Sequence, residues 1–154
     1  MKHTYFGELS MDINYSDDVI WNKELYLNGW KVEIHVWAEQ RQTLDVARLD
    51  AFALLLQNLT DVDVRARMHL VDFLKADDKE TGYIAYHMEN LPDLAPLGIS
   101  PDAFAQAMQL THIDLSANTG EVMLDYKIAP GHSGQILCVH LDAQGDFGEV
   151  NWES

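Results

Sequence analysis

The sequence holds a single cysteine, Cys138, among 154 residues. No disulfide can therefore form within the chain, and zinc sites built from several cysteines are excluded. Proline is also scarce, with four residues, whereas hydrophobic residues make up 47% of the chain. A disordered chain would hold far less apolar material. At 17.5 kDa the sequence predicts one domain, residues 1–154, large enough to bury a core without covalent cross-links.

Positively charged residues are also scarce. Ten Lys and Arg residues stand against 25 Asp and Glu, which gives a formal net charge of −15. Such a chain is repelled by phosphate backbones and by anionic lipid, so binding to nucleic acid or to a membrane is not expected. Two interpretations of the acidity stay open: it steers a basic partner toward the protein, or it only confers solubility.

Long apolar runs are absent as well. The first 18 residues lack the apolar segment of a signal peptide. No stretch approaches the roughly 18 apolar residues that a bilayer-spanning helix needs. We therefore expect a cytoplasmic protein.

Motifs for cofactors and metals are missing too. The seven histidines form no H-x-x-x-H pair, and His69 and His87 stand alone, as surface or interfacial side chains do. The chain has no G-x-G-x-x-G and no other glycine loop for phosphate. No cofactor and no metal are predicted from these patterns.

The stretch PGHSGQIL, residues 130–137, falls one residue short of the G-x-S-x-G signature of serine hydrolases. A nucleophile elbow needs a strand that turns sharply into a helix. Here the residues after Ser133 alternate as a strand does, and the second glycine comes one position early. Proline, glycine and serine are ordinary hairpin-loop residues, so we interpret the segment as a loop.

Asn28-Gly29 predicts a two-residue type I′ turn, because both positions of that turn need positive φ. The turn sets Leu27 against Trp30, Leu25 against Val32 and Trp21 against Val36 on one face, together with Ile34. The opposite face carries Glu24, Tyr26, Lys31, Glu33, His35 and Trp37. An earlier strand is expected over residues 4–13.

The middle of the chain has helical periodicity, which predicts about four helices. In the first helix the apolar stripe is Leu44, Ala47, Ala51, Leu55 and Leu59. The second is expected to begin at Thr60 or Asp61 and to bury Val64, Met68, Val71 and Leu74. A shorter helix ends before Pro92, and Ser100-Pro101-Asp102 starts the last one, with serine as its cap.

The last third alternates with period two and predicts a four-strand meander. Its turns lie around Thr119-Gly120, Gly131–Gly134 and Gln144-Gly145. The inward positions are Ile113, Leu115, Val122, Leu124, Tyr126, Ile128, Leu137, Val139, Leu141, Val150 and Trp152. The fold class is therefore α+β: an antiparallel sheet from the N-terminal hairpin and the C-terminal meander, with the helical segment inserted between them and packed on one face.

The outward face of the meander carries Cys138 and a polar row. The expected register sets Asp114 opposite Asp125, Asp125 beside His140, and His140 beside Glu149. Three interpretations are open: a solvated face, an acidic docking surface for a basic protein, or a metal site of two carboxylates and one histidine. Tyr26 and Trp37, on the outer side of the hairpin, either anchor an interface or lie under a second helical layer.

Several segments together resemble a family of small bacterial proteins classed only as a domain of unknown function. They are FGEL, the W-x-x-E-L-x-L-x-G-W-x-V hairpin at residues 21–32, LDYKIAP, QILCVHLDAQGDF and the terminal WES. The resemblance spans most of the chain and is strongest over residues 120–154. Its motifs are turn glycines and strand aromatics, so it implies a fold and no catalytic residue. Some similar small acidic proteins act as immunity proteins beside secreted toxins.

The sequence thus favours a non-catalytic binding protein, of the immunity type, that masks a basic toxin domain, such as a nuclease. The alternatives are a small metal-assisted enzyme that uses the outward row, and a housekeeping interaction module. The residues predicted to bind the partner are Asp114, Asp125, His140, Glu149, Glu24, Tyr26, Glu33 and Trp37.

Overall fold

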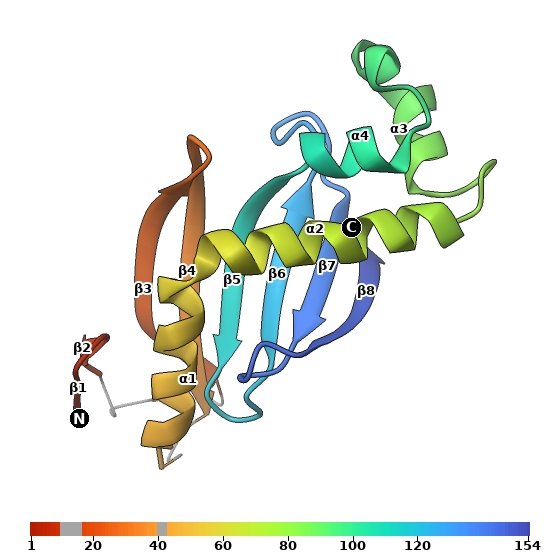
Figure 1. Ribbon diagram of the computed structural model, residues 1–154. Helices are drawn as coiled ribbons and strands as arrows, with labels where there is room; N and C mark the ends of the chain where they lie inside the picture. Colours follow the sequence, from red (N-terminus) through yellow and green to blue (C-terminus); the bar gives the residue numbers. More distant parts are fainter. Residues whose placement is uncertain (10–16, 40–42) are drawn as a thin grey trace.

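The computed structural model describes residues 1–9, 17–39 and 43–154 of the chain (Figure 1). Its main element is a six-stranded sheet in the order β3-β4-β5-β6-β7-β8. The strands are β3 (Asp17–Leu27), β4 (Trp30–Glu39), β5 (Gln109–Ser116), β6 (Val122–Lys127), β7 (Ile136–Leu141) and β8 (Phe147–Glu153). The predicted α+β class is confirmed, with the helices between the hairpin and the meander.

One strand pair departs from the predicted antiparallel pattern. β4 and β5 run parallel, whereas the other neighbours in the sheet are antiparallel. Parallel neighbours need a long crossover, and the helical segment between residues 43 and 108 supplies it. The hairpin and the meander therefore join through the centre of a mixed sheet.

The first hairpin forms as predicted. Asn28 and Gly29 both have positive φ, 53° and 82°, as a type I′ turn requires. The predicted pairs Leu27 with Trp30, Leu25 with Val32, and Trp21 with Val36 are confirmed. Near the start of β3, an irregularity between Val19 and Trp21 shifts the pairing register with β4.

The strand expected over residues 4–13 is wrong in its described part. β1 (Lys2–His3) and β2 (Gly7–Glu8) instead pair as a separate two-stranded sheet, and residues 10–13 lie outside the described residues. The buried His3 ring fixes this turn, since its Nδ1 accepts from the backbone N–H groups of Tyr5 (3.1 Å) and Phe6 (3.3 Å). Its Nε2 donates to Asp50 at 2.7 Å and ties the turn to the helical layer.

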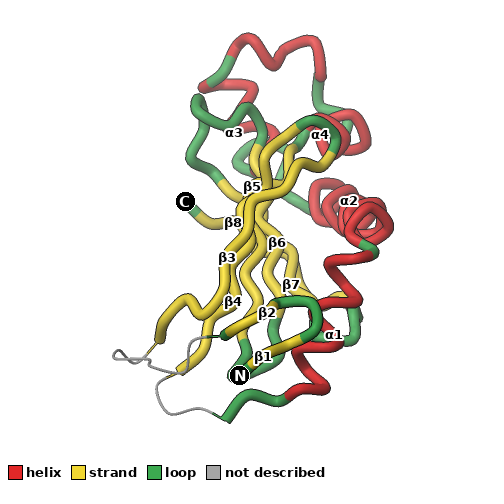
Figure 2. The backbone as a smooth tube through the Cα atoms, turned by 90° about the vertical axis from the view of Figure 1, so that its left-hand side faces the viewer, coloured by secondary structure: helices red, strands yellow, loops and turns green. Residues whose placement is uncertain are grey.

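The helical segment contains α1 (Val46–Gln57), α2 (Leu59–Ala76), α3 (Tyr83–Asn90), the 3-10 helix η1 (Pro92–Leu97) and α4 (Pro101–Ala107). Figure 2 shows α1, α2 and α4 on one side of the sheet. The predicted start of α4 is confirmed, because the Ser100 hydroxyl accepts from Ala103 N–H. None of the helices in the described ranges combines the length and the apolar character that a membrane crossing requires.

The predicted buried face of α2 is wrong in part. Val64 and Met68 are exposed, at 56% and 63% of their surface, and the helix begins at Leu59 after the cap residue Asn58. The buried stripe is Leu59, Val62, Asp63, Ala66, Leu70 and Leu74. Two stripes of apolar residues share the same helical spacing here, and the stripe that is buried includes a carboxylate.

The stripe expected for α1 is also displaced. Ala47 is exposed and Ala51 half-buried, whereas Leu55 and the flanking Leu44 and Leu59 are buried. The helix packs through Leu49, Phe52, Ala53, Leu55 and Leu56 after the cap residue Asp45. The aromatic Phe52 sets this rotation, because burying its ring removes more apolar surface than burying Ala47 or Ala51.

The core lies between the helices and the inner face of the sheet. The inward positions predicted for β5, β6 and β7 are all buried, as is Ile128, and the inward Val150 and Trp152 of β8 pack at its margin. Asp63 of α2 lies within this layer. Its carboxylate accepts from the Tyr126 hydroxyl at 2.6 Å and from Arg67 Nε at 3.1 Å. Arg67 in turn donates to the carbonyls of Ala105 (2.8 Å) and Met108 (2.6 Å) where α4 ends.

Candidate functional site

The outer face of the sheet, the face opposite the helices, is the candidate site (Figure 2). Alternation along each strand places its residues, because the apolar partners point to the core. Tyr26 is 73% exposed and Trp37 is 37% exposed, so neither is buried under a second helical layer in the described part of the chain. Among the described residues, the ionisable side chains of this face include Glu24, Lys31, Glu33, His35, Glu39, His112, Asp114, Glu121, Asp125, Lys127, His140 and Glu153.

The polar row predicted across the meander is not formed. Asp125 pairs with His112 on one side and with Cys138 on the other, whereas Asp114 and His140 both pair with Met123. Each of these pairings is shifted by two residues from the predicted register. A shift of two residues keeps each side chain on the outer face but changes its neighbour on the next strand. Irregularities between Leu110 and His112, and between Val139 and Leu141, belong to this register.

The β7–β8 irregularity sets Gly148 and Glu149 together opposite His140. The Glu149 side chain is exposed, and within the described residues the ion pair of His140 is with Glu121, at 2.6 Å. The metal site of two carboxylates and one histidine predicted from this row therefore has no geometric basis among the described residues. Asp114, Asp125 and His140 do lie on the predicted outer face.

Histidines and carboxylates alternate across neighbouring strands of the outer face. Three imidazoles each approach one carboxylate: His35 with Asp114 at 3.6 Å, His112 with Glu33 at 3.4 Å, and His140 with Glu121 at 2.6 Å. On the hairpin, Lys31 lies 3.6 Å from Glu24 and 3.5 Å from Glu33, and the two carboxylates raise its pKa. The sequence had shown these residue types, but the pairs of His35 and His112 depend on the parallel β4–β5 register, and the pair of His140 depends on the β6–β7 register.

A shallow cavity of about 480 Å³ opens beside Trp37 on this face. It is lined by Trp37, Glu39, Asp114, Ser116, Asn118, Thr119, Glu121 and Met123. Trp37 Nε1 donates to Asp114 at 2.8 Å, which holds the indole at the rim. An exposed aromatic held beside an acidic hollow suits a cationic side chain of another protein.

Asp125 and Cys138 form the least solvated polar pair of the face. Burial raises the pKa of the Asp125 carboxyl, and the nearby Asp114 charge adds to that rise. Burial likewise raises the pKa of the Cys138 thiol far above its ordinary value, with a further contribution from the Asp125 charge. The thiol is therefore neutral in the protein as it stands.

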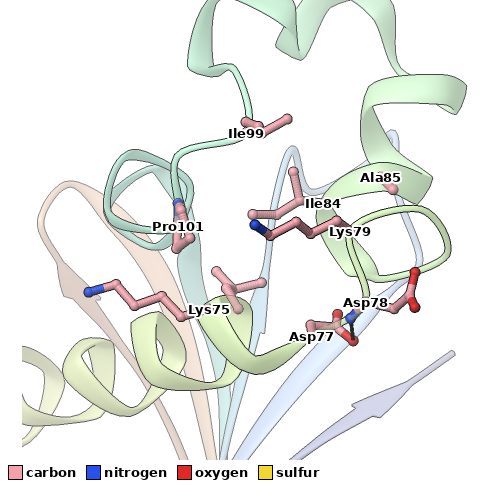
Figure 3. A pocket seen from close by; sticks show the side chains of 9 residues that line it. Lys75, Asp77, Asp78, Lys79, Ile84, Ala85, Ile99 and Pro101 are labelled. Atoms are coloured by element: carbon pink, nitrogen blue, oxygen red, sulfur yellow. Dashed lines mark hydrogen bonds between the residues drawn. The ribbon is translucent and has the colours of Figure 1, made fainter.

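A second cavity, of about 230 Å³, lies under α3 on the helical side (Figure 3). Apolar side chains line most of it, including Ile84 and Ile99, and two lysines, Lys75 and Lys79, stand at its edge. Its two aspartates, Asp77 and Asp78, accept hydrogen bonds from backbone N–H groups of the following turn. They are thus committed to holding the turn before α3.

Ser133, interpreted above as a loop residue, lies against a buried histidine. Its hydroxyl is 2.7 Å from His87 Nε2, and His87 Nδ1 is 2.8 Å from the Tyr83 carbonyl. Because a carbonyl only accepts, Nδ1 carries the proton and Nε2 accepts from the serine. The resulting pair resembles a serine–histidine dyad, a geometry that the sequence pattern around Ser133 alone did not indicate.

The backbone N–H groups of the loop around Ser133 already donate hydrogen bonds within the loop. The N–H groups of His132 and Ser133 both donate to the Ala129 carbonyl, so they do not form an oxyanion hole. Gln135 N–H donates to the Ser133 hydroxyl. We interpret this hydrogen-bonded pair as a structural contact that holds α3 against the loop between β6 and β7.

His87 should make the folded state sensitive to acid. Burial lowers its pKa in the folded protein, so below about pH 6.5 the unfolded chain binds a proton that the folded chain does not. Stability therefore falls as the pH drops through 6.5 and levels off below the folded-state pKa. Urea unfolding of the wild type and of His87→Gln, from neutral to mildly acidic pH, should show a stability difference that shrinks in acid. A difference that stays constant with pH would contradict this assignment, since the other histidines are common to both proteins.

The chain matches no protein-family model, no curated protein and no solved structure. Its function is therefore inferred from the outer face itself.

Proposed function

We propose that the chain is a binding protein whose outer sheet face docks a basic protein partner. The observation that carries the proposal is that this face combines uncovered aromatic side chains with an excess of carboxylates. Isolated exposed apolar residues are common on any surface, but a tryptophan beside a charged hollow, with the exposed Tyr26 elsewhere on the same face, is typical of binding sites.

Charge defines the class of partner. Among the described residues of the outer face, two lysines stand among at least seven carboxylates, in a chain whose net charge is −15. A basic protein is drawn to such a surface, and the attraction speeds its encounter more than it strengthens the final complex. Raising the ionic strength is therefore expected to slow association and to leave dissociation nearly unchanged.

The aromatic side chains are placed to hold the partner once it arrives. Tyr26 and Trp37 lie on adjacent antiparallel strands, and Trp37 is oriented by its bond to Asp114. Six strands of 6 to 11 residues, spaced by about 4.8 Å, offer a face on the order of 700 Å². Standard interfaces bury about 800 Å² per partner, so the face and its rim suffice.

Within this class, an immunity protein that neutralises a toxin domain is the function we favour. The family that the chain resembles has similar small acidic proteins in that role, and nuclease toxins are typically basic. Masking a toxin needs a stable soluble domain with a complementary face and no chemistry of its own.

The test is a pair of matched double variants, assayed for binding to any toxin domain that a neighbouring gene encodes and for rescue of growth from it. Tyr26→Ser/Trp37→Ser alters the outer face, and Val64→Ser/Met68→Ser removes exposed apolar side chains from α2 on the opposite side. Each aromatic anchor contributes about 2 kcal/mol, so the first variant should bind at least 30-fold more weakly and fail to rescue growth. The second should bind and rescue as the wild type does.

The reverse result would place the docking surface on the helices and refute the proposal for the outer face. Equal binding by both variants and the wild type would refute it too. Both variants are to be compared with the wild type by circular dichroism, so that a loss of binding is not a loss of folding.

A further inference from the structure

The strands β7 and β8 bring three different metal-binding groups together at one end of the outer face. Cys138 and His140 are two residues apart on β7, so both point outward, and Glu153 lies on β8 next to them. The Cys138 Sγ, a His140 ring nitrogen and a Glu153 carboxylate oxygen all lie within 4.8 Å of one another. This cluster shares only His140 with the row predicted from the sequence.

The distances suit a tetrahedral cation after a small adjustment. With zinc bonds of about 2.0–2.3 Å, neighbouring ligand atoms are about 3.5 Å apart. Closing the cluster thus needs a movement on the order of 1 Å, and Glu153 is exposed and free to rotate toward β7. From β6, Asp125 pairs with Cys138 across the sheet, and its negative charge lies beside the thiol.

The His140 imidazole already has the hydrogen-bond partner that is usual for a metal-binding histidine. Its Nδ1 is 2.6 Å from the Glu121 carboxylate, which can only accept, so Nδ1 carries the proton and Nε2 keeps its lone pair. Asn151 Nδ2, at 3.1 Å, donates to that lone pair. A carboxylate on the far nitrogen is the usual partner of a metal-binding histidine, since it fixes both the tautomer and the ring orientation.

The chemistry of the donors selects the cation. A thiolate with an imidazole and a carboxylate suits zinc and related transition metals, whereas magnesium and calcium prefer sites made of oxygen. Cys138 is buried between carboxylates that oppose its ionisation, and a divalent cation would both displace the thiol proton and neutralise those charges.

We propose that Cys138, His140 and Glu153 form a binding site for a zinc-class divalent cation, with Glu121 as the positioning residue for His140. The site does not depend on the proposed docking of a partner. Metal binding releases the thiol proton, so affinity rises with pH.

The test is a titration of the untagged, full-length protein with Co²⁺, followed by displacement with Zn²⁺. A thiolate-to-cobalt charge-transfer band should appear in the near ultraviolet, should vanish in Cys138→Ser, and should fade as Zn²⁺ is added. His140→Ala should bind at least tenfold more weakly, and Glu121→Gln between about 10-fold and 100-fold more weakly.

The matched control is His112→Ala, which removes an imidazole from the same face outside the cluster and should leave the affinity unchanged. His140 is only half-buried, so its replacement tests the site even where the buried Cys138→Ser variant fails to fold. Absence of the thiolate band in the wild type, or equal Co²⁺ affinity in His140→Ala and the wild type, would overturn the proposal.

Discussion

Asp63→Ala is expected to destabilise the protein by about 3–5 kcal/mol, because it leaves the Arg67 guanidinium buried without its counter-charge. The Asp63 carboxylate binds both Arg67 and the Tyr126 hydroxyl, so its loss also orphans a hydroxyl deep in the core. Domains of this size have only about 5–15 kcal/mol of stability in total. Urea unfolding should therefore show a large drop in the midpoint, and thermal unfolding a fall on the order of 10 °C.

The same helix offers a matched control. Asp61 and Arg65 form an ion pair at the same i,i+4 spacing, at 3.2 Å, but on the exposed side. Solvent screens such a pair, so Asp61→Ala should cost less than about 1 kcal/mol. Equal losses in the two variants would mean that burial of Asp63 does not govern its contribution.

Gly82→Ala is expected to have the next largest effect, since the added methyl group has no room. A Cβ at this position would lie 2.2 Å from the Asp78 carbonyl oxygen and 2.6 Å from the Asp77 carboxylate. Both groups hold the turn before α3 through bonds to Gly82 N–H and Tyr83 N–H. Overpacking costs about 1–3 kcal/mol of stability. Because the added methyl group would meet a backbone oxygen, we expect Gly82→Ala to lose about 3 kcal/mol or more.

The damage from Gly82→Ala should be local to α3. Tyr83 and His87 are buried on that helix, so displacing its start pulls both from their partners in the β6–β7 loop. Hydrogen exchange should therefore quicken in α3 before the sheet responds. The control is Gly134→Ala, where a Cβ meets nothing within 4 Å and φ is not positive. Equal stability of the two variants would contradict the steric account.

The faces of the strands could be predicted from the sequence, whereas the partners across them could not. Alternation placed Asp114, Asp125 and His140 on the outer side because period two is a local property. Their neighbours depend on turn length and on irregularities such as the one before His112. Nothing in a single sequence marks those insertions, so the predicted row was displaced by two residues.

The buried faces of the helices were predicted wrongly for a different reason. In α2 two stripes compete, and the buried one contains Asp63, which periodicity counts as a surface residue. Its burial depends on Arg67 and on Tyr126, and Tyr126 is 63 positions away in the sequence. The pairing of Ser133 with His87 escaped prediction likewise, since the two come from a loop and a helix that meet only in the folded chain.

The parallel pair in the centre of the sheet also determines the order in which the chain can fold during synthesis. In this parallel pair, Ile34 of β4 lies opposite Ile113 of β5. The hairpin is complete long before β5 exists, and at about 5–20 residues per second the ribosome needs several seconds to make the segment between them. During that time β4 presents an unpaired edge with Val32, Ile34 and Val36 on one face. Newly made chains are therefore most open to mispairing and chaperone binding at β4, and slowing translation within the helical segment should lower the soluble yield.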